Sequence, residues 1–239
     1  MTTVPLRIAT YNVHGGVGLD RRYDPARIAR VIVEMNADVV ALQELQSRGD
    51  TDMLDVLSRE TRMQAIDAVT FRNARGDFGN GLLTRLPVVS SERIDLSILG
   101  REPRNAIDAT MDYDGISLRI IATHLGLHAS ERREQSARLI AAVKRHPELA
   151  TILLGDINDW TLPRHAVRAL HGHFGESEAP GTYPSLLPAF ALDRIWASAP
   201  SALVRVHAHR SRTARVASDH LPLVADLELS QPPEPAHTG

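Results

Sequence analysis

Short apolar runs that each end in a polar residue recur along this 239-residue chain and limit the folds open to it. In one of them, Ile152–Leu154 is followed by Gly155 and then by Asp156 and Asn158. A continuous apolar run of this kind is typical of a strand that is buried on both faces of its sheet. The glycine lets the backbone turn or approach a neighbouring segment closely. The stretch therefore predicts an interior strand that presents polar side chains where it ends.

Asp156 and Asn158 have two competing interpretations. In an extended backbone, residues two apart point to the same side, so the carboxylate and the amide would lie together. Such a pair can hold and polarise a water molecule near a metal ion or a phosphate. Asp and Asn are also common turn residues, and an Asx turn at the strand end likewise accounts for Asp156 and Asn158. The stretch alone favours the turn, and the rest of the chain changes that balance.

The sequence pattern predicts strands in both halves of the chain. Asp114-Gly115 is a turn that a tight hairpin prefers, and residues 63–99 look rich in strands. The expected strands are Leu6–Val13, Asp38–Glu44, Gly79–Leu83, the hairpin partners Asn105–Tyr113 and Ile116–His124, and then Leu192–Ala197, Leu203–His207 and Leu223–Leu229.

Helices are expected between several of these strands. Asp24-Pro25 is an N-cap followed by a proline at the first helical position, and Asn36 can close that helix. A second helix is expected over residues 52–62. A third is expected from a cap at Ser130 to about residue 145, and a fourth from a cap at Thr161 to about residue 170.

The mixture of elements favours the α/β class of fold. Expected strands outnumber expected helices by about two to one, and hairpins occur beside parallel-type crossovers. This combination predicts two packed sheets flanked by helices. We find neither an internal repeat nor a long linker, so we expect a single domain over residues 1–230. The tail over residues 231–239 contains three prolines and a glycine and is expected to be disordered.

Charge and composition exclude some classes of site. The charges of the 29 acidic and 27 basic residues nearly cancel, so the composition does not predict strong non-specific binding to nucleic acid. A nuclease with a local basic groove is still compatible with this balance. The chain has no cysteine, so disulfides and thiolate metal sites are impossible and any metal ion would need oxygen or imidazole ligands.

No segment of the sequence predicts membrane insertion or export. The N-terminal residues show no basic region followed by an apolar segment, so no secretory signal is visible. No apolar run reaches the roughly 18 residues that a membrane-spanning helix needs. We therefore expect a cytoplasmic protein, and we expect it to be a monomer.

Polar residues follow the apolar part of six expected strands. Because a polar group is costly to bury unpaired, one such residue has a simple structural explanation, whereas several favour strand ends that converge on one polar pocket. Carboxylates and amides favour a hard cation such as Mg²⁺ or Mn²⁺, and histidines with carboxylate partners supply acid and base groups near neutral pH. The residues are Asn12, Glu44, His124, the pair Asp156 and Asn158, Asp193, and the pair Asp219 and His220.

These polar strand ends belong to short motifs whose order resembles that of a known superfamily. In chain order they are Thr10-Tyr11-Asn12, Leu42-Gln43-Glu44, Thr123-His124, Gly155-Asp156-Ile157-Asn158, Leu192-Asp193-Arg194-Ile195 and Ser218-Asp219-His220. The series resembles the endonuclease/exonuclease/phosphatase superfamily over nearly the whole chain. Each motif is weak by itself, and the signal lies in the common order. The resemblance implies a four-layered α/β/β/α sandwich and Mg²⁺-dependent hydrolysis of a phosphoester.

The resemblance also implies roles for the carboxylates and amides. Glu44 looks like the main metal ligand with Asn12 beside it, and Asp219 like a further ligand, direct or through water. Asp156 would align or deprotonate the attacking water molecule. Asn158 would hold that water molecule or a phosphate oxygen.

The two histidines would handle charge and protons. His220, oriented by Asp193, would be the acid/base histidine. His124 would donate a hydrogen bond to a phosphoryl oxygen as negative charge develops there. On general grounds a lone histidine is more often a hydrogen-bonded structural residue, and Glu44 alone could end a strand in solvent. The ordered series favours the functional interpretation for all of them.

Two further residues are expected to touch the substrate. Asn80 matches a family stretch whose amide lies near the scissile phosphate. Arg104 matches a family arginine that reaches the substrate phosphate, for which its planar fork is suited, although a surface arginine in a loop explains it equally well. His14 stands where some family members place an acidic residue. The basic stretch Arg205–Arg215 is either a phosphate-facing rim or a solvated strand and loop.

The sequence therefore predicts a Mg²⁺-dependent phosphoesterase, with a phosphodiester favoured over a monoester. Its alternatives are a DNA or RNA endonuclease, a phospholipid or inositol phosphate hydrolase, and a binding module that has lost catalysis. The expected partner is a phosphoester substrate, namely a nucleic acid, a phospholipid or a small phosphate ester. Few aromatic residues are present to stack bases, since the chain has four Phe, four Tyr and two Trp.

Overall fold

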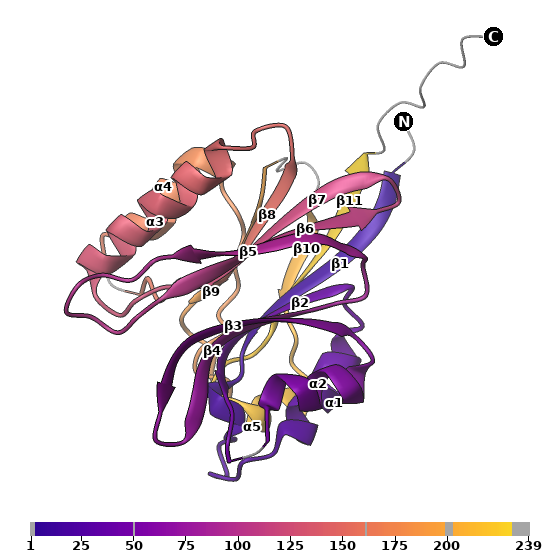
Figure 1. Cartoon of the computed structure of the whole chain (residues 1–239), viewed down its shortest axis with the longest axis vertical. Helices are drawn as coiled ribbons and strands as arrows, with labels where there is room; N and C mark the ends of the chain where they lie inside the picture. Colours follow the sequence, from indigo (N-terminus) through magenta and orange to yellow (C-terminus); the bar gives the residue numbers. More distant parts are fainter. Residues whose placement is uncertain (1–2, 50, 161, 199–202, 231–239) are drawn as a thin grey trace.

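The computed structural model describes residues 3–49, 51–160, 162–198 and 203–230, which build two mixed β-sheets packed face to face (Figure 1). The six-stranded sheet has the order β10 (Leu203–Ala208), β11 (Leu223–Ser230), β1 (Thr3–Asn12), β2 (Val39–Gln46), β4 (Gly76–Thr84) and β3 (Gln64–Asn73). The five-stranded sheet has the order β5 (Val88–Asp95), β6 (Asn105–Tyr113), β7 (Ile116–His124), β8 (Ala150–Asp156) and β9 (Asp193–Ala197).

Helices cover the outer face of each sheet. The helices α1 (Pro25–Met35), α2 (Met53–Thr61) and α5 (Ala214–Ala217) lie below the six-stranded sheet in Figure 1. The helices α3 (Ala129–Lys144) and α4 (His165–Phe174) lie above the five-stranded sheet. A short 3-10 helix, η1 (His14–Gly16), follows β1. The resulting order of layers confirms the α/β/β/α sandwich that the sequence resemblance implies.

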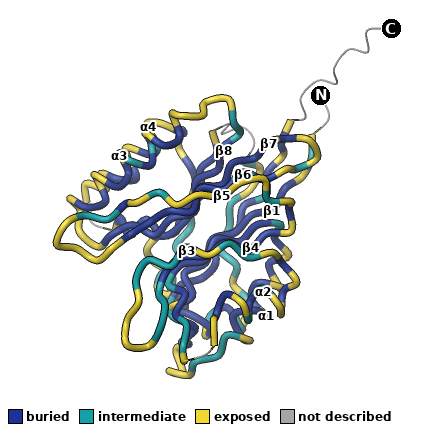
Figure 2. The backbone as a smooth tube through the Cα atoms, viewed as in Figure 1, coloured by how far each residue is buried: buried dark blue, intermediate teal, exposed yellow. Residues whose placement is uncertain are grey.

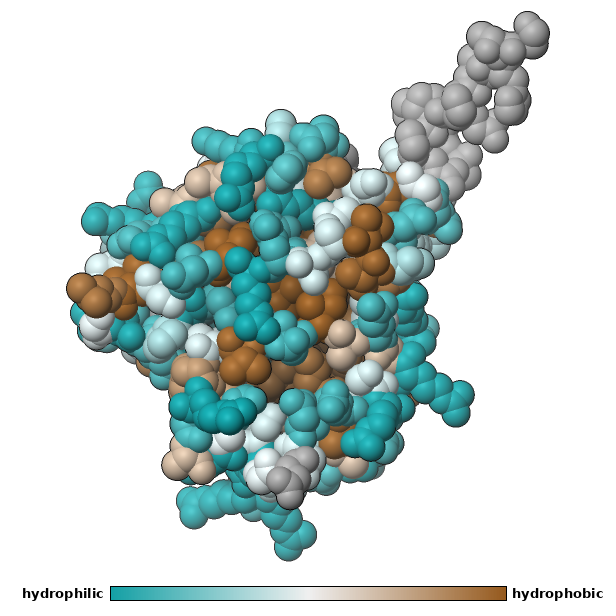
Figure 3. Space-filling model, in the orientation of Figure 1, coloured by the Kyte–Doolittle hydropathy of each residue, from teal (hydrophilic) through white to brown (hydrophobic). Residues whose placement is uncertain are grey.

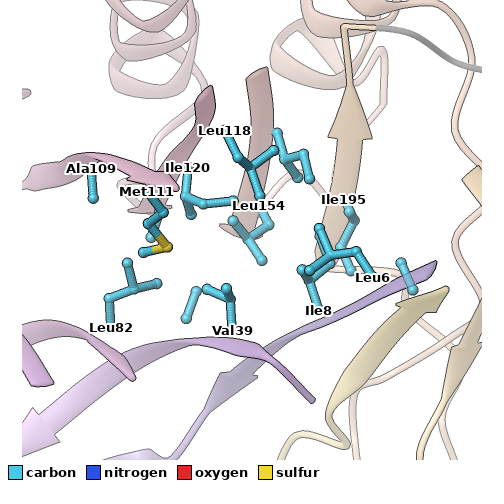
Figure 4. Close-up of a cluster of buried hydrophobic side chains, with 14 of the residues drawn as sticks. Leu6, Ile8, Val39, Leu82, Ala109, Met111, Leu118, Ile120, Leu154 and Ile195 are labelled. Atoms are coloured by element: carbon cyan, nitrogen blue, oxygen red, sulfur yellow. The ribbon is translucent and has the colours of Figure 1, made fainter. Parts of the chain in front are cut away.

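Apolar side chains fill the spaces between the layers. The central cluster joins the facing sides of the two sheets and includes Ile8, Val39, Ile120 and Leu154 (Figure 4). Two further clusters lie between each sheet and its helices. In Figure 2 the buried segments are therefore mainly strands, and exposure is concentrated in loops and on outer helix faces. Because β8 faces both the central cluster and the helical layer, its apolar run is buried on both sides, as the sequence predicts.

Each sheet contains one parallel pair of neighbouring strands. In the six-stranded sheet β1 and β2 are parallel and α1 connects them, and in the five-stranded sheet β7 and β8 are parallel and α3 connects them. Parallel neighbours require such a crossover, and their carboxyl ends then lie at the same edge of the sheet. Because β1 packs on β8 and β2 packs on β7 and β8, the four carboxyl ends meet at one end of the sandwich.

Most of the expected elements form where the local sequence signals place them. The hairpin of β6 and β7 has the predicted bounds, and Asp24 and Asn36 cap α1 as predicted. The predicted N-cap of α3 is wrong, because His128 rather than Ser130 is the cap. The reason is that the side chain of Glu131 accepts the backbone N–H of His128, which begins the helix earlier.

Some expectations lie outside the described residues or differ in extent. The predicted cap at Thr161 and the predicted disordered tail are outside the described part of the chain. The helix expected there begins at His165. The strand around Asn80 begins earlier than predicted, at Gly76. None of the helices in the described segments combines the length and the apolar character needed to span a membrane.

Most of the surface seen in Figure 3 is hydrophilic. Hydrophilic residues dominate the upper and lower parts of this view, and apolar residues show in a band across the middle. The band coincides with the layer between the two sheets in the same orientation in Figure 1.

Candidate active site

The carboxyl ends of the parallel strands carry four of the predicted site residues. Asn12 ends β1, Glu44 lies near the end of β2, His124 ends β7 and Asp156 ends β8. The neighbouring strands run antiparallel and bring further predicted residues to the same end. Asp193 begins β9 opposite Asp156, and residues 219 and 220 precede β11, which pairs with β1. The topology therefore gathers these residues at one end of the sandwich, as the sequence predicts.

Asn12, Glu44 and Asp156 form the centre of this group. The Asn12 Nδ2 donates to Glu44 Oε1 and to Asp156 Oδ2, both at 3.0 Å. Its Oδ1, the atom that would ligate a metal ion, accepts the backbone N–H of His14 at 3.1 Å. Asp156 is buried, whereas Glu44 is partly open to solvent. Two carboxylates thus face one amide, with no Lys or Arg side chain in ion-pair contact with either carboxylate among the described residues.

The backbone at Glu44 is irregular and directs this side chain into the group. The register between β2 and β4 shifts between Leu42 and Leu45, which is the signature of a β-bulge. Glu44 lies in the left-handed region with φ at 57°, which is uncommon for a non-glycine residue. Bulges re-aim a side chain at the edge of a site, and this one presents the Glu44 carboxylate to Asn12.

The geometry after β8 corrects the expectation of an extended backbone through Asn158. The strand ends at Asp156, and Asn158 has a φ of 55°. The Asp156 Oδ1 accepts the backbone N–H of Asn158 at 3.0 Å, so the turn interpretation of this stretch is correct. Asn158 still enters the site, because its Nδ2 lies 3.0 Å from His124 Nε2 and donates to Leu125 O at 3.0 Å. A turn and a functional position therefore coexist in the same residues.

His124 is a buried imidazole that lies between the Arg104 guanidinium and the Asp156 carboxylate. Its Nδ1 lies 3.4 Å from Arg104 Nη1, and its Nε2 lies 3.6 Å from Asp156 Oδ2. Burial, the Arg104 guanidinium and the charge on His220 all lower its pKa well below the usual value for histidine. Arg104 is itself buried and pairs with Glu102 at 2.8 Å. Arg104 is therefore part of the site and is not the surface arginine that the sequence also allowed.

Asp193 and His220 form a buried carboxylate–histidine pair. The His220 Nδ1 lies 2.9 Å from Asp193 Oδ2, and its Nε2 lies 3.8 Å from Asp156 Oδ2. Burial disfavours the imidazolium, but the surrounding carboxylates of Asp193, Asp156 and Asp219 outweigh burial and raise the pKa of His220 to about 10. Burial raises the pKa of Asp156 to about 6, against the opposing charge of His220. At neutral pH, a protonated imidazole therefore lies beside an ionised carboxylate.

Asp219 lies at the open side of the group. Its Oδ1 is 3.9 Å from His14 Nδ1 and accepts the Ser218 hydroxyl at 3.3 Å. No hydrogen bond in the described part of the chain joins Asp219 to Glu44 or Asn12. Ser218 makes the connection instead, because its hydroxyl donates to Asn12 O at 2.7 Å. His14 therefore contributes to the rim of the site beside Asp219.

Asn80 lies on β4 opposite the bulge of β2 that contains Glu44. The Asn80 Nδ2 donates to the backbone and side-chain oxygens of Asn105, both at 3.1 Å, which ties β4 to β6. It makes no hydrogen bond to the eight strand-end residues within the described segments. In the basic stretch, residues 203–208 form an edge strand, and Arg215 on α5 donates to Leu186 O at 3.3 Å. Only the end of the stretch thus approaches the site.

Several residues of the site were not singled out from the sequence. The Thr182 hydroxyl donates to Asp193 Oδ2 at 2.6 Å, and both side chains are fully buried. The ring of Tyr183 lies 4.9 Å from that of His220. The Ser218 hydroxyl donates to Asn12 O at 2.7 Å. Their motifs, Thr182-Tyr183 and Ser218-Asp219-His220, are visible in the sequence, but the long-range partners that give them a role are not.

The donor set fits a hard divalent cation on the Glu44 side of the site. Ligand atoms of Asp156, Asp193 and His220 also lie within 4.8 Å of one another. In this second set His220 Nδ1 lies 2.9 Å from Asp193 Oδ2, a carboxylate–histidine pair that also suits proton transfer. Glu44 and the Asn12 amide supply oxygen ligands, and the Glu44 carboxylate has no Lys or Arg partner among the described residues, which is the environment that Mg²⁺ or Mn²⁺ prefers.

Known proteins resemble this chain over most of its length. The model of the endonuclease/exonuclease/phosphatase family matches residues 9–220. The protein YbhP of Escherichia coli (strain K12) is 30% identical over 249 residues, which cover 93% of this chain and 96% of YbhP.

Solved structures show the same fold at lower sequence identity. An endonuclease/exonuclease/phosphatase from Bacteroides vulgatus has a TM-score of 0.80 and 18% identity, covering 95% of this chain and 100% of that chain. A mannosyl-6-phosphatase from Bacteroides thetaiotaomicron VPI-5482 has a TM-score of 0.75 and 16% identity, covering 94% of this chain and 100% of that chain. Together with the match over residues 9–220, these findings show that the chain belongs to the endonuclease/exonuclease/phosphatase family of phosphoester hydrolases.

Proposed function

We propose that the protein is a Mg²⁺-dependent phosphodiesterase. The observation that supports this most is the buried arrangement in which His220 lies 2.9 Å from Asp193 through Nδ1 and 3.8 Å from Asp156 through Nε2, where these carboxylates raise the pKa of His220 to about 10. Hydrolysis of a phosphodiester needs a base for the attacking water molecule and an acid for the leaving oxygen. His220 and Asp156 have the opposite protonation states that these tasks require near neutral pH.

The metal ion belongs beside Glu44 in this proposal. Glu44 and Asn12 would hold it, with Asp219 at the open side of the site. When bound, the ion would neutralise charge on the phosphate oxygens and so lower the electrostatic barrier to attack. Mn²⁺ has the same preference for oxygen ligands and would substitute for Mg²⁺.

The chain's own residues would position the reacting groups. Asp156 would accept a proton from the attacking water molecule, and Asn158 would hold a phosphate oxygen through its amide. His124, with Nδ1 facing the Arg104 guanidinium, would carry its proton on Nε2 and donate it in a hydrogen bond to a phosphoryl oxygen. Arg104 would offer its guanidinium to the phosphate from the side of the five-stranded sheet.

The proton for the leaving oxygen would come from His220. Asp193 keeps the imidazole oriented through Nδ1, so that Nε2 carries the transferable proton. Thr182 in turn fixes Asp193 through its hydroxyl. Thr182 and Asp193 are therefore positioning residues, whereas His220 would touch the reacting atoms.

A diester suits the charge of the site better than a monoester does. A phosphomonoester is largely a dianion near neutral pH, whereas a diester carries a single negative charge. Arg104 is the only guanidinium that contacts the strand-end group among the described residues. A monoester remains the second candidate, because the fold of the mannosyl-6-phosphatase shows that this architecture accommodates one.

Hydrolysis of small chromogenic esters tests the proposal. The protein should hydrolyse bis(p-nitrophenyl) phosphate in Mg²⁺, lose this activity in excess EDTA, and regain it when Mg²⁺ is restored. The monoester p-nitrophenyl phosphate should be a poorer substrate. His220→Gln should lower kcat by about 100-fold or more for a diester with an alkyl leaving group, because an alkoxide needs a proton to leave whereas p-nitrophenolate does not.

Two results would overturn the proposal. Undiminished activity in EDTA would exclude the metal, and full activity of His220→Gln toward the alkyl diester would exclude the acid. A clear preference for the monoester would replace the diester assignment with the second candidate.

A further inference from the structure

An apolar pocket opens directly beside the catalytic group. Its volume is about 380 Å³, and Leu127, Trp160, Tyr183, Phe190 and Leu192 form its walls. His220 and Asn158 are its polar boundary, so the pocket and the reacting groups share one space. Because His220 is the proposed acid, a group that fills this pocket would be attached to the leaving oxygen.

The apolar surface continues from the pocket onto three loops at its mouth. These loops span residues 125–128, the described residues 157–160 and 162–164, and residues 183–190, and each contributes to the pocket wall. They contain half of the large apolar side chains that are exposed in the described part of the chain. Leu162 is 85% exposed and Leu187 is 79% exposed, both beyond the pocket itself. We call the exposed apolar side chains of these loops the apolar rim; they are Leu127, Trp160, Leu162, Leu186, Leu187 and Phe190.

Arginines accompany each loop of the apolar rim. Arg101 Nη1 lies 3.1 Å from His128 Nε2, and Arg215 Nη1 donates to Leu186 O at 3.3 Å. Arg164 is exposed at the end of the second loop. None of these three guanidinium groups forms an ion pair within the described segments. Apolar side chains flanked by unpaired cations are complementary to a bilayer surface that carries anionic headgroups.

We propose that the substrate is a phospholipid in a membrane and that the apolar rim docks on the bilayer. This inference rests on the proposed phosphodiesterase function and names the substrate class. The pocket would hold the glycerol end of the lipid and the start of its acyl chains. Exposed apolar patches of this kind mark membrane or partner interaction sites.

Other leaving groups fit the pocket less well. An inositol or a sugar carries hydroxyl groups that the apolar wall would leave without hydrogen-bond partners. A nucleobase could stack on Trp160 or Tyr183, but it would not require Leu162 and Leu187 to project into solvent outside the pocket. A bilayer accounts for both the pocket and the projecting leucines.

The bond that breaks follows from the position of His220. Water would add its hydroxyl group to phosphorus, and the bond from phosphorus to the glycerol oxygen would break. That oxygen would take the proton of His220, and the proton lost by water would pass to Asp156. The products are a diacylglycerol and the phosphorylated headgroup, with no oxidant or further reactant.

Tryptophan fluorescence offers a direct test of docking. The chain has two tryptophans, and Trp196 is 1% exposed whereas Trp160 is 54% exposed. Adding vesicles of phosphatidylglycerol and phosphatidylcholine should therefore shift the emission of Trp160 to shorter wavelength and leave that of Trp196 unchanged. The double variant Leu162→Asp, Leu187→Asp should weaken vesicle binding at least tenfold. Val33→Asp, on the exposed side of α1, is a matched control and should bind like the unmodified protein.

The outcomes separate this inference from the proposed function. If the protein hydrolyses bis(p-nitrophenyl) phosphate but does not bind vesicles, the lipid inference is wrong and the phosphodiesterase stands. If a single-stranded oligonucleotide shifts the Trp160 emission and vesicles do not, the pocket is a base-stacking site and the inference is wrong. If vesicles bind, the double variant does not, and diacylglycerol is released, the inference is supported. Vesicle binding without hydrolysis of any phosphoester would contradict the phosphodiesterase and leave only the docking surface.

Discussion

The charge state of His220 depends on neighbours that are distant in the sequence. Asp193 lies 27 positions earlier and reaches His220 Nδ1 because β9 pairs with β8 next to the site. Without that carboxylate, burial would favour the neutral imidazole. The proposed acid is therefore a property of the pair, and its pKa should respond to changes at Asp193.

The pH profile of Asp193→Asn tests this dependence. His220 must be protonated to act as the acid, so kcat/KM for a soluble diester should fall as pH rises through about 10, the raised pKa of His220. Asp193→Asn replaces the carboxylate by a neutral amide and so removes the charge that contributes most to the raised pKa of His220. The alkaline limb of Asp193→Asn should therefore move to lower pH by more than one unit. An unchanged limb would show that another group is the acid.

Stability at different pH values tests the buried carboxylate of Asp156. Its pKa is raised from 3.8 to about 6, so the stability that it contributes is fully present below pH 3.8 and is lost as pH rises through about 6. In EDTA at pH 8, Asp156→Asn should therefore raise the free energy of unfolding by about 1–3 kcal/mol. At pH 3.5 the gain should vanish, and denaturant titration at the two pH values measures the difference. A loss of stability at pH 8 would contradict the assigned environment.

At this scale the sequence predicts which residue types gather but not all of their contacts. The order of the motifs correctly places Asn12, Glu44, His124, Asp156, Asp193 and His220 at one end of the molecule. It does not reveal that Thr182 fixes Asp193, or that Asn80 bonds to Asn105 on the other sheet. Hydrogen bonds between strands depend on register and inter-sheet packing, which no local pattern specifies.

Among the elements, the junction of β7 and β8 bears most directly on the site. Gly155 lies beside Thr123, one residue before both His124 and Asp156. Its φ is +148°, and a Cβ built there would lie 1.9 Å from Thr123 O. The sequence predicts a close approach or a turn at this glycine; the structure shows the close approach, and the turn follows at Asp156.

Replacement of this glycine should disturb the site through the sheet. Gly155→Ala must separate β7 from β8, and we expect a loss of on the order of 3 kcal/mol or more in the free energy of unfolding. Gly115→Ala, in the hairpin turn with φ at +79° and open space around it, is the matched control. It should cost about 1 kcal/mol, for its left-handed conformation alone. Equal losses in the free energy of unfolding of the two variants would contradict a tight contact between Gly155 and Thr123.

Element boundaries show where local signals suffice and where they do not. The turn at Asp114-Gly115 and the caps of α1 act within a few residues, so the sequence predicts these ends correctly. The start of α3 is missed because Glu131 selects His128 over Ser130 as the cap. The bulge at Glu44 is missed because it appears only when β2 pairs with β4.

The whole molecule brings the carboxyl ends of two parallel pairs together across a shared apolar core. Crossover connections fix the direction of each pair, and the central cluster fixes how the sheets face one another. Neither pair alone could assemble a site that needs Glu44 from one sheet and Asp156 from the other. The catalytic arrangement is therefore a consequence of sheet packing.

The balanced charge of the whole chain separates substrate classes. A formal net charge of -2 offers no broad attraction for a polyanion. Hydrolysis of a small diester should accordingly change little between 50 and 300 mM salt at fixed Mg²⁺. A steep decline with salt in the cleavage of a plasmid would instead indicate a phosphate-tracking surface and favour the nuclease alternative.

The Mg²⁺ dependence of diester hydrolysis in Glu44→Ala tests the central claim most directly. Glu44 is partly open to solvent, so the variant should fold and its stability can be checked independently. If Glu44 holds the metal ion, kcat for bis(p-nitrophenyl) phosphate should fall by about 100-fold or more, and the Mg²⁺ concentration for half-maximal rate should rise. Turnover and Mg²⁺ dependence equal to those of the unmodified protein would contradict the assignment of the metal ion to this site.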